Sequence, residues 1–259
     1  MAVQPDDRRP VSPDRADDLQ DPHATVPAAE DAAGTVERNN WRTRWFHAGV
    51  YLLVIVLLIT GWWLTTGHEG EPTFLAKWAD RSDAVLHTDV GYVLAGLAAM
   101  GIVLGWRAVR TLVWDSVRFR RAELRWFVRW PKAVFTGRFG RHDGHFDPGQ
   151  RIANIVMLIL LLVLVVSGIG LDQVSGGPAF VWWNRIHRWS TYIFTPVIAG
   201  HILIAAGVLP GYRGVWRAMH VGGRLRTRVA ARLWPAWLER RAAQEPSKPG
   251  RARADDGAP

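Results

Sequence analysis

Residues 152–171 read IANIVMLILLLVLVVSGIGL, a run without a single charged side chain. A helix needs about 20 mainly apolar residues to cross about 30 Å of hydrocarbon. The run therefore predicts a membrane-spanning helix. Three further apolar stretches of similar length lie at residues 46–64, 87–106 and 187–209. We expect an all-α integral membrane protein whose core is a four-helix bundle over residues 41–210.

The segments outside the spans have a different composition. Residues 1–40 are rich in Pro, Ala and Asp and poor in large apolar residues, which predicts a disordered tail, and residues 242–259 predict a second one. Residues 108–130, directly before Pro131, mix arginines with tryptophan and aliphatic residues, as do residues 213–241. This mixture is typical of amphipathic helices that lie in the membrane interface. We therefore expect residues 211–241 to form a cytoplasmic interfacial segment.

The overall composition fits a membrane protein once it is divided by segment. The mean hydropathy of −0.01 is an average over apolar spans and polar tails. Fifteen tryptophans suit a chain with many residues at membrane–water interfaces. The absence of cysteine excludes disulfides, cysteine-ligated zinc, iron–sulfur clusters held by this chain, c-type haem attachment and thiol nucleophiles.

The basic residues indicate how the chain is oriented. The chain has 32 Lys and Arg residues against 23 Asp and Glu residues. Residues 1–46 contain six of the basic residues, residues 107–151 eleven, and the tail from residue 210 eleven, whereas residues 66–86 and 171–188 contain two each. Basic loops stay on the cytoplasmic side of a membrane. We therefore expect both termini in the cytoplasm, and we attribute the net charge of +9 to topology and not to nucleic-acid binding.

Four of the nine histidines lie in or at the ends of the predicted spans: His47, His87, His187 and His201. Ionisable residues in a membrane are costly and usually mark functional sites. A single histidine at a helix end also has a simpler explanation as an interfacial side chain. We assign that role to four of the five histidines outside the spans: His68, His142, His145 and His220.

The positions of the four span histidines predict two pairs. His187 and His201 are fourteen residues apart, which is about 21 Å along a helix, and they share a helix face to within about 40°. The first span starts inside and the second outside, so His47 lies at the inner level and His87 at the outer level. Depth then pairs His87 with His187 and His47 with His201. Each pair suits a six-coordinate haem b with two axial imidazoles.

Small and basic residues accompany the predicted haem sites. Glycines recur in all four spans and allow close approach of helices or of a macrocycle. Haem propionates need cations, and the candidates are Arg185 and Arg188 outside and Arg44 and Arg151 inside. Contact with lipid phosphates is the alternative explanation for each arginine.

With these features in place, the chain resembles the cytochrome b (gamma) subunit of membrane-bound respiratory formate dehydrogenase. More broadly, it is similar to the b-type cytochromes of nickel–iron hydrogenases. The resemblance covers about residues 41–240 and includes the four histidines, the run RWFH at residues 44–47 and Thr60–Gly61. In that family the corresponding histidines bind two haems with the same cross-pairing.

The run FDPGQR at residues 146–151 resembles Asn-Ala-Gly-Gln-Lys of the formate dehydrogenase subunits. That family motif lies beside the inner haem and binds the quinone headgroup, which implies this role for Asp147, Gly149 and Gln150. Gly149 and Gln150 match the motif, whereas Asp147 stands in place of Asn and Pro148 in place of Ala. A turn followed by a helix start also explains this run.

The runs GVWRAM at residues 214–219 and LWPAW at residues 233–237 also resemble the formate dehydrogenase tail. The resemblance implies a multi-pass electron-transfer subunit of the bacterial inner membrane, with no catalytic residues of its own. Its implied partners are an iron–sulfur subunit and a molybdenum or tungsten catalytic subunit, and its substrate is a quinone, menaquinone or ubiquinone. Two alternatives stay open: a cytochrome that serves a hydrogenase or another molybdoenzyme, and a haem-free membrane anchor.

Overall fold

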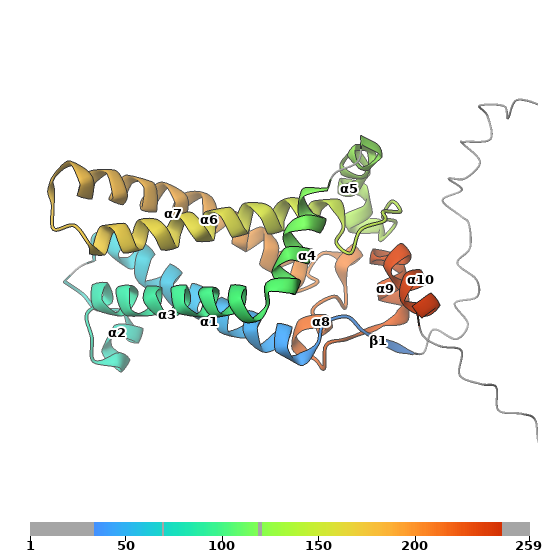
Figure 1. The fold of residues 1–259 in the computed structure, drawn as a ribbon, viewed down its shortest axis with the longest axis horizontal. Helices are drawn as coiled ribbons and strands as arrows, with labels where there is room; N and C mark the ends of the chain where they lie inside the picture. The colour runs from blue at the N-terminus through green and yellow to red at the C-terminus, as the bar shows by residue number, and fades with distance from the viewer. Residues whose placement is uncertain (1–33, 69, 119–120, 245–259) are drawn as a thin grey trace, which may run out of the picture.

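The computed structural model describes residues 34–68, 70–118 and 121–244. In this part of the chain, four long helices lie side by side in an elongated bundle (Figure 1): α1 (Trp41–Thr65), α3 (Asp83–Leu104), α6 (Pro148–Asp172) and α7 (Gly177–Ala205). α1 packs along α3 and α6 packs along α7, so the bundle consists of two helical hairpins. The hairpins meet through α3 and α6, whereas the backbones of α1 and α7 rarely come close.

Length and apolar composition make α1, α3 and α6 each able to cross a membrane. α7 meets the same test when it is taken together with the segment Pro210–His220, which is bent by 60° from it. The structure therefore confirms the predicted all-α membrane fold.

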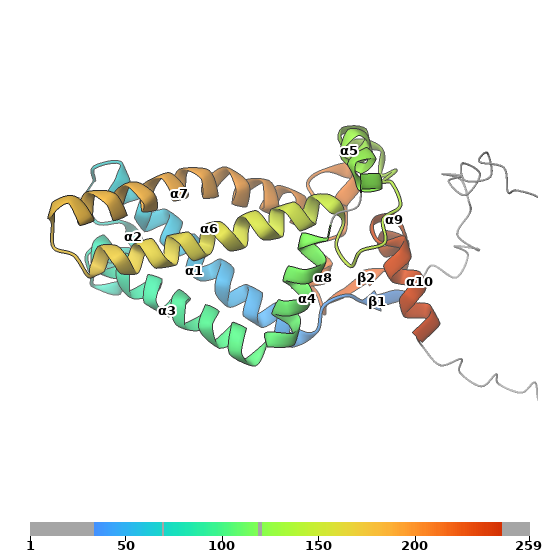
Figure 2. The same ribbon diagram turned by 45° about the horizontal axis from the view of Figure 1, so that its top comes forward.

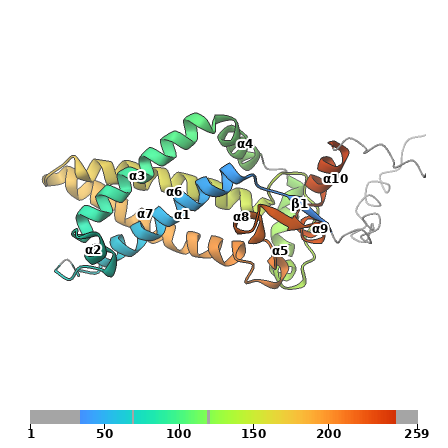
Figure 3. The same ribbon diagram turned by 90° about the horizontal axis from the view of Figure 1, so that it is seen from below.

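The fourth helix begins ten residues earlier than the predicted span at residues 187–209. Gly177 has a φ of +75°, and Pro178 lies in the first turn of α7. Glycine accepts a positive φ without steric cost, and the missing N–H of a proline is not needed in a first turn. Because α7 starts here, Arg185 lies inside the helix and not before it, and His187 and Arg188 lie near its middle and not at its start. The α6–α7 hairpin extends beyond the ends of α1 and α3 (Figures 1 and 3).

Side-chain caps explain where three of the long helices begin. The side chain of Asn40 accepts from the N–H of Thr43 before α1, and the Ser82 hydroxyl accepts from Val85 before α3. The Asp147 carboxylate accepts from the N–H of Gln150 before α6. Each cap satisfies a backbone donor that the first helical turn leaves without a partner.

The connection between α1 and α3 contains the short helix α2 (Phe74–Ala79). Its start is tied to the start of α3, because Asp83 accepts from the Thr73 N–H at 2.8 Å and from the Thr73 hydroxyl at 2.6 Å. α2 therefore lies at the same end of the bundle as the α6–α7 turn (Figure 3).

The predicted interfacial helix over residues 108–130 is wrong in its extent. The structure has α4 (Trp106–Val117), the 3₁₀ turn η4 (Arg121–Glu123) and α5 (Leu124–Thr136). Pro131 does not end α5 but lies inside it, where it removes one backbone hydrogen bond. The helix instead ends at Gly137, which has a φ of +73° and whose N–H bonds to the carbonyl of Ala133.

The predicted disordered tail over residues 1–40 is also wrong at its end. Strand β1 (Thr35–Glu37) pairs antiparallel with β2 (Arg224–Arg226), with Val36 opposite Leu225. Figure 2 shows this ribbon beside the C-terminal helices. The rest of that predicted tail, residues 1–33, lies outside the described residues.

The C-terminal segment is not one interfacial helix. It contains η5 (Pro210–Tyr212), α8 (Arg217–His220), β2, α9 (Thr227–Leu233) and α10 (Pro235–Gln244). Gly222 and Gly223, which have positive φ angles, form the turn between α8 and β2, and Pro235 follows the C-cap residue of α9, Trp234. Since α10 includes residues 242–244, the predicted C-terminal tail is ordered there, and residues 245–259 lie outside the described residues.

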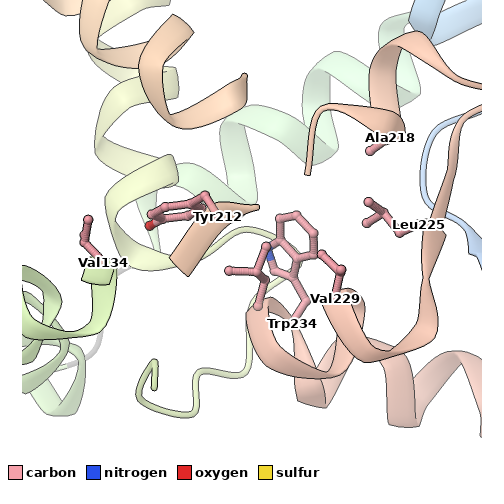
Figure 4. Close-up of a cluster of buried hydrophobic side chains, with 7 residues drawn as sticks. Val134, Tyr212, Ala218, Leu225, Val229 and Trp234 are labelled. Carbon is pink, nitrogen blue, oxygen red and sulfur yellow. The ribbon is translucent and has the colours of Figure 1, made fainter. Parts of the chain in front are cut away.

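These short elements pack into a cap at one end of the bundle, with a core of its own. Its buried residues are Val134, Tyr212, Ala218, Leu225, Val229, Leu233 and Trp234. Figure 4 shows Tyr212 between Val134 of α5 and Trp234 at the end of α9. Most apolar side chains of residues 211–241 are therefore used for packing within the protein, whereas Trp216 and Val221 are exposed.

Candidate functional site

The four span histidines come together in two pairs inside the bundle. The ring centroids of His87 and His187 are 6.1 Å apart, and those of His47 and His201 are 6.3 Å apart. His87 lies near the start of α3, at the end of the bundle that holds α2. His47 lies near the start of α1, at the end of the bundle next to the cap. The structure thus places the predicted partners side by side at two levels.

The spacing within each pair fits two ligands on one iron. A histidine nitrogen binds a metal at about 2 Å and the ring centre lies about 1 Å farther out, so two axial imidazoles have centroids about 6 Å apart. Both observed separations agree with this value. In the parts of the chain that the structure describes, no group of three or more His, Cys, Asp or Glu side chains is arranged around a metal site. Each pair therefore supplies two ligands, the number that a haem iron takes from the protein, and not the three or more that a metal ion without a haem needs.

Glycines leave open volume beside the histidines. A Cβ built on Gly91, one helical turn after His87, would have no atom within 4 Å, and the same is true of Gly200, directly before His201. Both glycines are only partly exposed. Together with the sparse backbone contact between α1 and α7, the open space at these two glycines is compatible with a flat macrocycle, so the residues present fit a haem at each pair.

Hydroxyl groups contact the outer pair. Nδ1 of His87 lies 2.9 Å from the Thr60 hydroxyl on α1, and Nδ1 of His187 lies 3.0 Å from the Ser167 hydroxyl on α6. Both hydroxyl residues are fully buried. Among the described residues, the inner rings of His47 and His201 contact each other, and His47 also contacts Tyr51, without a comparable hydroxyl partner.

An apolar layer separates the two levels. Its buried residues are Val54, Leu94 and Phe194, which follow His47, His87 and His187 by seven residues each. Seven residues are two helical turns, so each layer residue lies on the same face as its histidine. Phe194 lies midway between the two histidines of α7, so buried apolar side chains separate the two levels.

The four candidate arginines for haem propionates have different surroundings. Arg185 and Arg188 are exposed on α7, and Arg188 donates to the Tyr192 hydroxyl at 3.1 Å. Nε of Arg44 donates to the carbonyl of Met219 at 2.9 Å. These three keep guanidinium nitrogens available for a carboxylate.

Arg151 is engaged elsewhere. It is buried and forms an ion pair with Glu123 at 2.9 Å, and it also donates to the carbonyls of Arg118 and Phe146. Its remaining nitrogen lies against Gly144. This surrounding argues against the propionate role expected for Arg151, because the guanidinium is enclosed by protein.

The three residues predicted to bind quinone lie where α6 begins. Asp147 is buried, and burial raises the pKa of its carboxyl. Gly149 packs against the Trp126 ring, which would be only 2.9 Å from a Cβ at this position. The side-chain oxygen of Gln150 is buried and has no hydrogen-bond partner among the residues that the structure describes. Asp147 thus caps the helix, while Gln150 keeps a free acceptor.

Asn154 is a polar residue at this site that the sequence analysis missed. Its side-chain nitrogen is also buried without a partner in the described part of the chain. α6 and α7 are antiparallel, and Ser167 of α6 lies beside His187 of α7. Asn154 is thirteen residues before Ser167, and Gly200 is thirteen residues after His187. Asn154 therefore lies at the level of Gly200, next to His201. A lone amide one turn after Gln150 in an apolar run is the sequence signal that could have identified it.

The remaining histidines only partly match their predicted interfacial role. His68 stacks on Trp63 near the surface, and His220 lies edge-on to Tyr51. His142 and His145 are instead packed within the cap. The ring of His142 bonds to the carbonyl of Leu233 at 2.9 Å, and Nδ1 of His145 accepts from Arg38 at 3.3 Å. For these two residues the interfacial prediction is wrong, because cap packing and not lipid surrounds them.

A family comparison agrees with this geometry. The family described as prokaryotic cytochrome b561 matches residues 38–222, a range that includes all four long helices and both histidine pairs. The chain belongs to the prokaryotic cytochrome b561 family. It is therefore a membrane protein that transfers electrons through b-type haem. Among curated proteins, no sequence matches this cytochrome closely enough to count as a relative.

Proposed function

We propose that this cytochrome is the membrane electron-transfer subunit of a respiratory formate dehydrogenase. Electrons from an iron–sulfur partner would enter at the His87/His187 level and leave at the His47/His201 level to a quinone. The observation that carries the proposal is the pair of histidine sites at metal-binding separation, stacked along α7. The formate donor rests on the resemblance of residues 44–47, 146–151, 214–219 and 233–237 to the formate dehydrogenase subunit.

Two haem b groups, when bound, supply one-electron carriers at the two levels. His47 with His201 and His87 with His187 would hold the two groups, and two histidines per iron would leave no open position for oxygen. The two levels are fourteen residues apart on α7, about 21 Å. Phe194 and its neighbours fill the intervening space with apolar side chains.

Gln150 and Asn154 are the groups that we assign to the quinone headgroup. The Gln150 oxygen accepts a hydrogen bond from a quinol hydroxyl, and the Asn154 nitrogen donates one to a quinone carbonyl. Their lack of a partner in the described structure supports this role, because buried polar groups normally have one. Asp147 lies about one turn before Gln150 and about two turns before Asn154, and its raised pKa suits a group that carries a proton from the cytoplasm.

The orientation of the chain in the membrane sets the direction of electron transfer. With both termini in the cytoplasm of a bacterium, α2 and the α6–α7 turn face outward and the cap faces inward. Each electron that moves inward against an inside-negative potential costs about 2.3 kcal/mol per 100 mV for a full crossing. The potential difference between formate and quinone drives this step, and proton uptake from the cytoplasm makes the reaction electrogenic.

The test is to purify the cytochrome with its native partner subunits and to follow the haem α band. We expect formate to reduce both haems, added quinone to reoxidise them, and proteoliposomes to build up a membrane potential during turnover. Reduction by hydrogen and not by formate, with hydrogenase subunits in the complex, would instead assign the cytochrome to a hydrogenase. A complex without haem would leave only the membrane-anchor role.

A further inference from the structure

Two equivalent contacts hold the outer histidine pair, one on each helical hairpin. Thr60–Gly61 on α1 lies against His87 of α3, and Ser167–Gly168 on α6 lies against His187 of α7. In both hairpins a hydroxyl residue and the glycine after it, near the end of the first helix, meet a histidine on the second helix. We call each such pair a seat.

The hydroxyl groups of both seats donate hydrogen bonds to carbonyl groups of their own helices. The Thr60 hydroxyl donates to the carbonyl of Val56 at 2.9 Å, and the Ser167 hydroxyl donates to the carbonyl of Val163 at 2.6 Å. A hydroxyl has one hydrogen and two lone pairs. Since the hydrogen is used on the carbonyl, the hydroxyl oxygen accepts from Nδ1 of the facing histidine. The backbone carbonyl of Leu164 is a second acceptor for the His187 ring, so the Thr60 contact is the more decisive of the two.

This arrangement favours one tautomer of each ring. If Nδ1–H is the donor, then Nε2 of His87 and of His187 has no hydrogen and is the metal ligand. The opposite tautomer would require the hydroxyl to donate to the ring, which would deprive a buried backbone carbonyl of that hydrogen bond.

The glycines of the seats fix the rotation of the rings. A Cβ on Gly61 would be 2.9 Å from Cε1 of His87, and a Cβ on Gly168 would be 3.4 Å from Cε1 of His187. Each ring therefore lies with its Nδ1–Cε1 edge on the neighbouring helix, and Nε2 lies on the side of the ring away from the hydroxyl. The two outer rings stand nearly perpendicular, at 82°, compared with 49° for the inner pair.

We propose that Thr60 and Ser167 are positioning residues that hold the outer histidine pair in one tautomer and orientation, and that the inner pair lacks this control. The proposal rests on the proposed haem at His87 and His187. A hydrogen bond from Nδ1–H makes an imidazole a stronger electron donor to the metal. The two seats thus favour the oxidised form of the outer haem and lower its midpoint potential.

The variants Thr60→Val and Ser167→Ala test the proposal, because each removes a hydroxyl with little change in volume. Thr60→Ser keeps the hydroxyl. Thr65→Val is the matched control: the Thr65 hydroxyl donates to the carbonyl of Gly61 at 2.8 Å on the same helix but contacts no histidine. Redox titration of the α band and electron paramagnetic resonance of the oxidised protein are the readouts, because the resonance spectrum depends on the angle between the axial imidazole planes.

In Thr60→Val and Ser167→Ala, we expect one midpoint potential to become more positive and one low-spin signal to change, while those of the inner haem stay unchanged. Haem affinity at the outer site should fall about 10–100-fold, as for other partners of metal ligands. Thr60→Ser and Thr65→Val should match the wild type. Unchanged potentials and signals in both hydroxyl-free variants would overturn the proposal, as would an equal loss of haem in Thr65→Val. A wild-type protein without haem would instead overturn the proposed function itself.

Discussion

The imidazole rings of His47 and His201 face each other with centroids 6.3 Å apart, although their helices, α1 and α7, rarely bring their backbones close. His87 and His187 repeat the arrangement at 6.1 Å. Side chains and not backbone contacts therefore define the space between these helices. The separation is the one that two axial ligands of an iron require.

Phe194 should be a main support of this arrangement, because it is buried between the two histidine levels. We expect Phe194→Ala to lower the free energy of unfolding by about 3–5 kcal/mol, the usual cost of such a cavity. Thermal unfolding in detergent, followed by release of haem, measures the change. Ile193→Ala, next in the chain but half exposed, is the control and should cost much less. Equal effects of the two variants would contradict a packed layer.

The ion pair of Arg151 and Glu123 is buried, with side-chain exposures of 4% and 10%. Arg151→Met would leave the Glu123 carboxylate without this partner, and we expect a loss of about 3–5 kcal/mol in the stability of the cap. Removing both charges in Arg151→Met, Glu123→Leu should restore most of the loss. A double variant as unstable as the single one would show that the Arg151 side chain matters for another reason. Arg141→Met, at an exposed pair with Glu239, is the matched surface control.

The cap should become less stable in mild acid because of His145. Burial and the neighbouring Arg38 guanidinium lower the pKa of His145 to about 4. The unfolded chain, with an ordinary pKa of about 6.5, binds a proton first as the pH falls. Stability is therefore full above pH 6.5 and is lost between about pH 6.5 and 4, by up to about 3 kcal/mol.

The measurement is the unfolding free energy at pH 7.5 and at pH 5. His145→Gln, which cannot be protonated, should lose less stability than the wild type over this interval. His68→Gln changes an exposed histidine and should keep the wild-type pH dependence. A His145→Gln variant with the same pH dependence as the wild type would rule out this origin.

Gln150 and Asn154 should matter for the quinone and not for the haems. We expect Gln150→Ala and Asn154→Ala each to slow quinone reduction about tenfold, the effect of losing about one hydrogen bond, with unchanged haem spectra. Gln173→Ala, at the opposite end of α6, is the control. Wild-type rates in both inner variants would place the quinone elsewhere.

Much of the bundle follows from the sequence because lipid demands long apolar helices. The observed bounds of α1, α3 and α6 differ from the predicted spans by only a few residues. The start of α7 was missed because hydropathy measures compatibility with lipid, whereas Arg185 and Arg188 are compatible with a helix. The proline in its first turn was the better signal.

The cap could not be predicted in the same way. A basic segment with interspersed tryptophans has the same local pattern whether it lies on a membrane or packs on other protein. What decides between them is contact between distant residues, such as Val36 opposite Leu225. A pattern read along the chain does not contain such a contact.

Part of the candidate site could likewise be predicted from the sequence, and part of it could not. Helical rise and orientation were enough to pair the four histidines by depth. The roles of Thr60 and Ser167 were not visible, because a hydroxyl in a span normally bonds its own helix and both residues do so. Only the fold shows that each oxygen also meets a histidine on the neighbouring helix.

The most direct test of the account is the amount of haem b per chain in purified wild type and in the variants His187→Ala and His201→Ala. We predict two haems in the wild type, one in each single variant and none in the double variant. The His187→Ala variant should keep the inner haem and His201→Ala the outer one, with distinct midpoint potentials. A wild type with fewer than two haems, or a double variant with normal haem content, would contradict it.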